Sequence, residues 1–213
     1  MKKNCIFILA GFFILIASQL FAQKITSGDL SVLKGQNKIS VTYDYSKMAV
    51  GKFKTEDEYI QKGIDDRNAK KPGTGDDWAV KWKAGKTERY QPSFEESFNN
   101  QASDCGLQVK VDPEAKYVFV VHTNEMEQGV ETVVMGAAKS ASVDLVIDLI
   151  ESSAPDKTIA TIEMDGAKPH SNMRMTVGGV PVNKEVYDPT IRIAECYETA
   201  GKQIGKLICK QLK

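Results

Sequence analysis

Apolar and polar residues alternate along several stretches of the chain, a period of two that is typical of strands with one buried face. The first such stretch runs from Ile39 to Tyr45. Residues 142–150 alternate again, a turn-forming segment follows at 152–156, and residues 158–164 form a second strand-like stretch. We therefore predict one strand near the start of the chain and a β-hairpin over 143–164.

Two further strands are expected between these elements. Residues 107–111 alternate, whereas Tyr117–Val121 is a continuous apolar run. Such a run favours a central strand covered on both faces.

A charged insertion separates the first strand from the rest of the predicted sheet. Residues 54–71 form an exposed helix with Thr55 as its N-cap, because acidic residues follow this threonine and lysines close the segment. A second short helix places Trp78 and Trp82 on one face and ends at Gly85.

Two amphipathic segments predict core helices. Phe94 and Phe98 share one face of the first helix, which Gly106 terminates. Asp188 caps the second helix, whose apolar stripe runs nearly to the carboxyl end, and its glycines would allow close approach to a sheet. The predicted fold class is α+β: a mainly antiparallel sheet with two core helices on one face, and a helical insertion at about 54–87 between the first strand and the first core helix.

The first 22 residues read as a cleaved signal peptide. Two lysines precede an apolar run of 12 residues at 6–17, and a more polar stretch leads to a cut after Ala22. That run is too short for a membrane anchor, and Cys5 lies before it, where it could not carry a lipid. We expect residues 23–213 to form a single exported domain, periplasmic or secreted, without a stable membrane anchor.

Charge excludes one class of partner. The chain carries 28 basic and 28 acidic residues, and loss of Lys2 and Lys3 with the signal peptide leaves 26 basic residues. Proteins that bind nucleic acid carry a concentrated basic excess. We therefore expect no nucleic-acid partner.

Three cysteines remain after signal cleavage, and an oxidising compartment would permit one bridge among them. Cys196 and Cys209 lie on one predicted helix, about 20 Å apart along its axis, so they cannot pair. If the two core helices run antiparallel, the end of the first lies near Cys196. This arrangement predicts a Cys105–Cys196 disulfide.

The patterns that carry catalysis or cofactor binding are weak. Residues 84–87 resemble the end of a phosphate-binding loop but lack its first glycine, and the two histidines lack zinc spacing. We expect no cofactor and no metal, and a protein that is not an enzyme. The alternative is an envelope hydrolase or isomerase in which Asp144 acts with Glu163 or with His122 as an acid–base pair.

Candidate binding residues come from two segments. Trp78 and Trp82 lie in an otherwise polar insertion, and tryptophans often supply binding energy at interfaces, although both rings could instead be satellite core. Residues 128–141 are rich in glycine, alanine and serine and contain Met135 and Gly136. We predict that these two segments bind an envelope protein or a cell-wall component.

The second half of the chain resembles known envelope domains. Its order of apolar strand, glycine-bearing loop, hairpin over Val143–Met164 and amphipathic carboxy-terminal helix is similar to that of the Tol-Pal translocation protein's amino-terminal region and of the curli-secretion lipoprotein. The lipid-free signal peptide and the tryptophan insertion resemble those of uncharacterised secreted Bacteroidetes proteins. The resemblance implies a noncatalytic binding or assembly module of the bacterial cell envelope.

Overall fold

The protein is described here by a computed structural model of residues 23–129, 139–170, 176–177, 180–181 and 188–213. The strands are β1 (Gln23–Gly28), β2 (Lys38–Asp44), β3 (Ala49–Val50), β4 (Gln108–Val109), β5 (Tyr117–Glu127), β6 (Ser142–Glu151), β7 (Ala154–Ala167), β8 (Thr176–Val177) and β9 (Val180–Pro181). The helices are α1 (Glu56–Asn68), α2 (Thr74–Gly85), α3 (Gln91–Ala102) and α4 (Pro189–Leu212), with 3₁₀ turns η1 (Ser31–Leu33) and η3 (Ser103–Cys105) and a π-helical segment η2 (Lys86–Tyr90).

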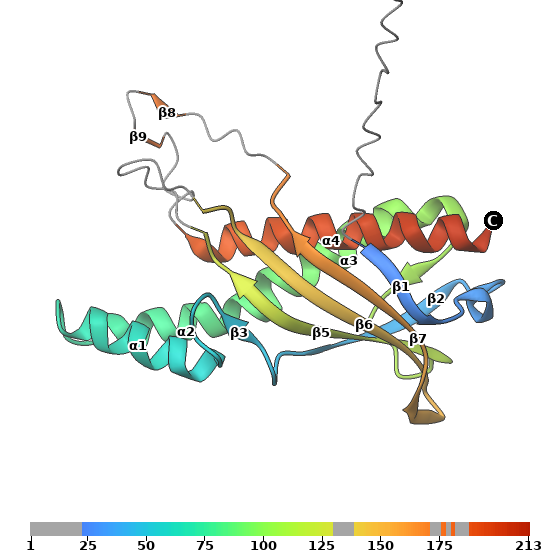
Figure 1. The fold of residues 1–213 in the computed structure, drawn as a ribbon, viewed down its shortest axis with the longest axis horizontal. Helices are drawn as coiled ribbons and strands as arrows, with labels where there is room; N and C mark the ends of the chain where they lie inside the picture. The colour runs from blue at the N-terminus through green and yellow to red at the C-terminus, as the bar shows by residue number, and fades with distance from the viewer. Residues whose placement is uncertain (1–22, 130–138, 171–175, 178–179, 182–187) are drawn as a thin grey trace, which may run out of the picture.

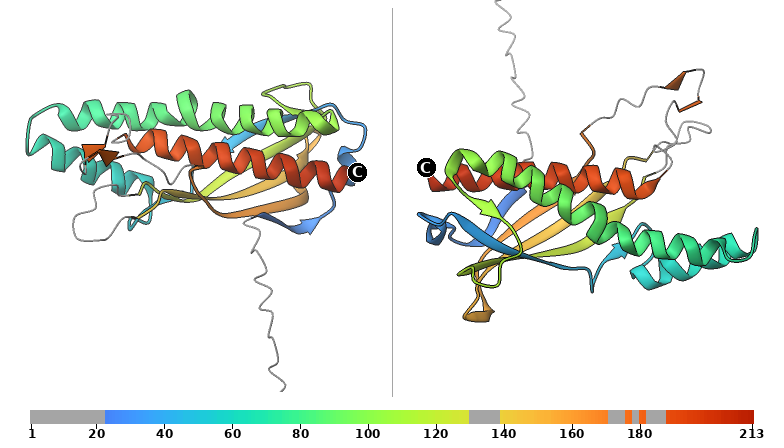
Figure 2. Two further views of the ribbon diagram at one scale, coloured as in Figure 1. Left: turned by 90° about the horizontal axis from the view of Figure 1, so that it is seen from above. Right: turned by 180° about the vertical axis from the view of Figure 1, so that it is seen from behind.

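Within these ranges the main sheet has seven strands in the order β1-β7-β6-β5-β2-β4, with β3 beside β5 (Figure 1). The neighbours among β1, β7, β6 and β5 pair antiparallel. The pairings of β2 with β5, β2 with β4 and β3 with β5 are parallel. Two helices cover one face of this sheet (Figure 2). The predicted α+β class is confirmed.

The hairpin of β6 and β7 forms as the alternation predicts. Val143, Leu145, Ile147 and Leu149 are all at most 1% exposed and face the helices. The expectation for Tyr117–Val121 is wrong in one respect, because β5 is central but alternates between buried and half-buried residues. Its second face is open, since both core helices lie on the other side of the sheet (Figure 2).

The helix layer consists of α3 and α4, which run side by side in the same direction (Figure 2). A Cβ atom added at Gly201 would lie 2.3 Å from the carbonyl oxygen of Phe94, and one at Gly205 would lie 3.0 Å from that of Phe98. These glycines were expected to let α4 approach a sheet. They instead let its backbone approach α3.

The parallel direction of these helices overturns the predicted disulfide. Cys105, just beyond α3, is bonded to Cys209 near the end of α4, with Cα atoms 5.4 Å apart. Cys196, the expected partner, is buried in the core and takes no part in this disulfide. The prediction assumed antiparallel helices, and parallel packing brings the two carboxyl ends together instead.

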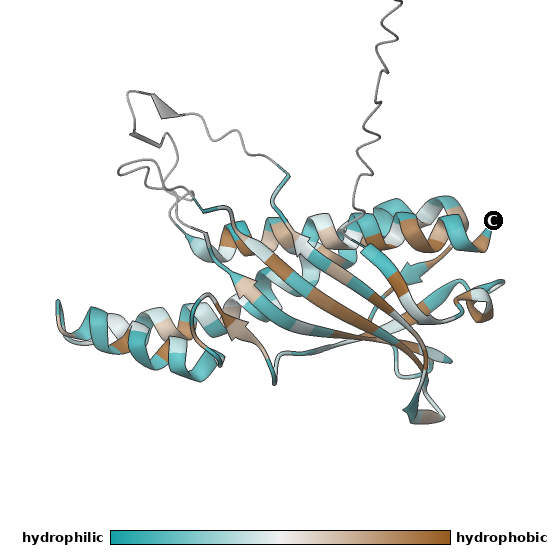
Figure 3. Cartoon of the chain, in the orientation of Figure 1, coloured by the Kyte–Doolittle hydropathy of each residue, from teal (hydrophilic) through white to brown (hydrophobic). Residues whose placement is uncertain are grey.

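The insertion forms a helical arm, defined here as α1 and α2, that projects beyond the sheet (Figure 1). Thr55 caps α1 as predicted, because its side chain accepts a hydrogen bond from the Glu58 N–H. The α-helix α2 ends at Gly85 as predicted, but the chain stays helical beyond it, because the π-helical segment η2 leads directly into α3. Hydropathic colouring shows a mostly polar arm beside a more apolar body, the body being the rest of the described chain (Figure 3).

Candidate functional site

Both tryptophans of the arm are packed. Trp82 is 1% exposed, and its ring centroid lies 4.7 Å from that of Tyr59 and 6.0 Å from that of Trp78. Trp78 is half-buried, and the Arg67 guanidinium lies 4.0 Å from the centroid of its ring. These rings form the core between α1 and α2, so any binding surface on the arm consists of its outer side chains.

A buried polar network joins the arm to the body. The Trp82 indole N–H donates to the Glu56 carboxylate at 2.9 Å, and the Lys86 ammonium binds the other oxygen of that carboxylate at 2.5 Å. The Glu56 and Lys86 side chains are only 14% and 19% exposed. Lys86 thus lies in a helical segment and pairs with Glu56 of α1, and residues 84–87 do not form a phosphate-binding loop.

The arm also forms a hydrogen bond with Gln128, the residue directly after β5. The Tyr59 hydroxyl donates to the Gln128 side-chain carbonyl at 2.7 Å, and burial raises the pKa of Tyr59 to about 12, which keeps that proton in place. From the other side, Arg192 on α4 donates to the Gln128 main-chain carbonyl at 2.9 Å. We call this contact of Tyr59, Gln128 and Arg192 the arm–loop junction.

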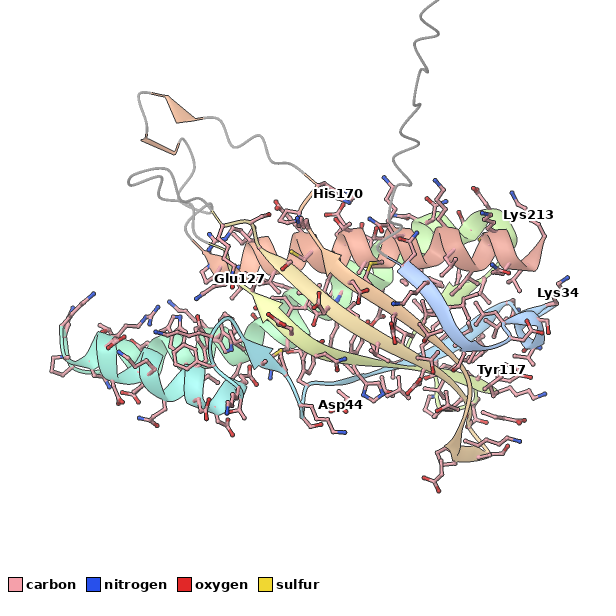
Figure 4. The ribbon with its side chains drawn as sticks, in the orientation of Figure 1. Lys34, Asp44, Tyr117, Glu127, His170 and Lys213 are labelled. Carbon is pink, nitrogen blue, oxygen red and sulfur yellow. A yellow bond between two sulfur atoms is a disulfide. The ribbon has the colours of Figure 1, made fainter. Side chains whose placement is uncertain are left out.

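The backbone at Gly129 passes close to that at Ala141. Gly129 has a positive φ of 73°, and a Cβ atom there would lie 2.7 Å from the Ala141 nitrogen. Gly129 and Ala141 are therefore neighbours in space, close to Glu127, which Figure 4 labels. The candidate residues Met135 and Gly136 fall outside the described residues.

A second polar cluster lies on the open face of the sheet, with Asp44 at the end of β2 (Figure 4). His122 Nδ1 is 2.9 Å from an Asp44 carboxylate oxygen, and its Nε2 is 3.5 Å from an oxygen of Asp148. The Thr161 hydroxyl donates to the other oxygen of Asp148 at 2.7 Å. We call these four residues the histidine–aspartate cluster.

The acid–base pairs proposed from the sequence do not come together. Asp144 accepts a hydrogen bond from the Gly166 N–H at 2.6 Å, and Glu163 pairs with Lys24 at 2.9 Å. Across the β5–β6 pairing His122 lies opposite Val146, whereas Asp144 lies opposite Glu125. Asp44 was not predicted from the sequence; it reaches His122 because β2 pairs in parallel with β5.

Among the described residues, no group of three histidine, cysteine, aspartate or glutamate side chains is arranged to hold a metal ion. In the same ranges, none of the helices is both long and apolar enough to cross a membrane.

Comparison with known proteins gives little. No protein-family model matches the chain, and no curated protein matches it. Among solved structures, a PelC dodecamer from Paraburkholderia phytofirmans is similar at 14% identity and a TM-score of 0.34, covering 83% of this chain and 96% of that one. A point variant of that dodecamer gives 16% identity and a TM-score of 0.33, covering 66% and 78%. Similarity this low assigns no function.

Proposed function

We propose that this protein is a noncatalytic binding or assembly module of the bacterial cell envelope, exported to the periplasm or secreted. Its partner, an envelope protein or a cell-wall component, binds at the end of the molecule where the helical arm meets the loop after β5. The arm–loop junction carries this proposal, because it brings together the two segments that the sequence marks for binding.

The arm's construction supports this role. Its aromatic rings face inward and fix α1 against α2, while its outer surface stays exposed. A rigid appendage presents a surface to a partner with little loss of conformational entropy on binding.

The disulfide supports export. Bridges of this kind persist in oxidising compartments such as the periplasm and are rare in the cytosol. The Cys105–Cys209 pairing therefore agrees with the predicted signal peptide, which lies outside the described residues.

Two exposed valines allow a matched test. Val80 on α2 is 69% exposed and Val111, beyond β4 in the body, is 65% exposed. A photo-crosslinking amino acid at position 80 should give a crosslinked product in intact cells, and the same residue at position 111 should not. Equal crosslinking at both positions, or none at position 80, would count against a partner on the arm.

The histidine–aspartate cluster favours a second candidate, an envelope hydrolase or isomerase. An imidazole between two carboxylates is suited to proton transfer. The His122 side chain is 31% exposed on an open sheet face, where water competes for every such contact. His122→Gln should abolish turnover if this candidate holds, and should leave crosslinking from position 80 unchanged under the main proposal.

A further inference from the structure

The last three turns of α4 carry a row of lysines that the proposed function does not use. Lys202, Lys206, Lys210 and Lys213 are all exposed, and no acidic residue stands among positions 202–213. Spacings of four, four and three residues place them on one face of the helix. At 1.5 Å of rise per residue, the row is about 17 Å long.

None of these lysines forms an ion pair with a described residue, and the nearest acidic residue on α4 is Glu198, one turn before Lys202, which lies 3.6 Å from the His170 ring. On α1, by contrast, Lys62 pairs with Asp66 one turn away. The exposed face of α1 is therefore an ordinary solvated surface with neighbouring charges of opposite sign. The lysine row differs, because it concentrates one sign of charge in a chain with no net charge.

Helix stability does not explain the row. Cations near a helix carboxyl end interact favourably with the helix dipole, but only within the last turn, which accounts for Lys210 and Lys213. Lys202 and Lys206, and likewise Lys206 and Lys210, are like-charge pairs at i, i+4. Each such pair destabilises a helix.

The helix beneath the lysine row is held firmly. Ile204 and Ile208 are fully buried on its inner side, and Cys209 is bonded to Cys105 beyond α3. The end of α4 is thus fixed to the body, and Figure 4 shows Lys213 directly beyond it. The spacing of the charges is set before any ligand arrives.

We propose that the lysine row binds a linear polyanion, an acidic polysaccharide whose carboxylates lie along the outer face of α4. A polymer can meet several lysines at once, so that each contact after the first is effectively intramolecular. This surface lies at the opposite end of the molecule from the arm, and its role does not depend on the proposed arm–loop site (Figure 1).

A polymer fits the lysine row better than a membrane surface does. Helices that lie in a bilayer interface bury a broad apolar face among the lipids. The apolar face of α4 packs into the core, and among the described residues the exposed large hydrophobic side chains are Val80 and Val111, neither of them on α4. The row is also one lysine wide, which suits a strand rather than a plane.

The test measures binding of the intact, disulfide-bonded protein to polygalacturonate, with neutral dextran and anionic phosphatidylglycerol vesicles as the comparison probes. The first variant is Lys202→Gln/Lys206→Gln/Lys210→Gln. The matched control, Lys47→Gln/Lys110→Gln/Lys157→Gln, removes the same charge from exposed lysines elsewhere in the body.

We expect the protein to bind polygalacturonate and not dextran, with an affinity that falls as salt rises. The α4 variant should weaken binding by about tenfold or more, and the control by less than about twofold. Equal loss in both variants, no binding to polygalacturonate, or binding to the vesicles alone would overturn the proposal. Crosslinking from position 80 should persist in the α4 variant, which separates this result from failure of the arm site.

Discussion

The body and the arm bury their side chains in different ways. In the body, aliphatic residues of the sheet and two phenylalanines of α3 lie in layers between sheet and helices, and most are fully buried. In the arm, three rings, Tyr59, Trp78 and Trp82, pack against one another between two short helices. Aromatic side chains bury a large area each, so a helix pair too small for a layered core is still stabilised.

This difference matters for function, because it separates what folds the protein from what binds. The tryptophans stood out in the sequence as possible contact residues, yet they hold the arm together. The arm depends on few contacts and the body on many. Perturbing one region should therefore leave the other folded, and the following predictions test that separation.

The largest effect on stability is expected from loss of the disulfide in the body. The Cys105–Cys209 bond closes a loop with a sequence separation of 104. Cys105→Ser/Cys209→Ser should lower the free energy of unfolding by about 4 kcal/mol, chiefly because the unfolded chain gains freedom. Denaturant titration measures this loss, and adding a reductant to the unmodified protein should reproduce it. An unchanged unfolding midpoint would show that the disulfide does not stabilise the fold.

The next effect should stay within the arm. Trp82→Ala removes the central ring and its hydrogen bond to Glu56, at a cost of about 3 kcal/mol. Hydrogen exchange should accelerate over Glu56–Asn68 and stay slow over Ser142–Glu151. In the control, Trp82→Phe, an aromatic ring remains while the N–H and part of the indole are lost, so the destabilisation should be smaller than for alanine. Loss of protection in both segments would mean that arm and body unfold together.

Two glycines sharpen the comparison further. A Cβ at Gly201 would lie 2.3 Å from a backbone oxygen of Phe94, and one at Gly63 would lie 2.2 Å from the ring of Trp78. The backbone of α3 cannot yield, whereas a half-buried ring can shift. We expect Gly201→Ala to destabilise by about 2 kcal/mol. Gly63→Ala should stay within about 1 kcal/mol of the parent, because alanine favours the helix. Thermal unfolding compares the two, and equal losses would contradict this reasoning.

Local sequence predicted the elements of the body well, for reasons visible in single residues. Alternation placed Val143 and Leu149 on the buried face, and Thr55 and Asp188 cap their helices as expected. The strand β1 was missed, because Gln23–Gly28 contains a single large apolar residue and is held by pairing with β7.

The sequence could not show whether elements that are distant in the chain pack parallel or antiparallel to one another. Nothing local distinguishes parallel from antiparallel packing of α3 and α4, so Cys105 was assigned the wrong partner. The same limit hid Asp44, which meets His122 only through a parallel strand pairing 78 residues apart in sequence. The arm–loop junction likewise depends on a tertiary hydrogen bond from Tyr59 to Gln128.

The smallest predicted effect concerns the stability of the fold at acidic pH. It depends on Asp44, the last residue of β2, which precedes the arm in the chain. Hydrogen bonds from the side chain and backbone of Ser46 lower the pKa of Asp44 from 3.8 to about 2, with smaller contributions from His122. A carboxyl group whose pKa is lower in the folded state stabilises the protein above its unfolded pKa, and this stability is lost as pH falls toward the folded value.

For Asp44 that window lies between about pH 4 and pH 2. Asp44→Asn should therefore reduce the fall in stability across this window, and Ser46→Ala should do so partially, because it removes the largest cause of the shift. Some acid sensitivity should remain, since the pKa values of Asp29, Asp66 and Asp112 are lowered as well. Urea unfolding at a series of pH values measures this, and parallel curves for the parent and Asp44→Asn would show that Asp44 gains nothing from its partners.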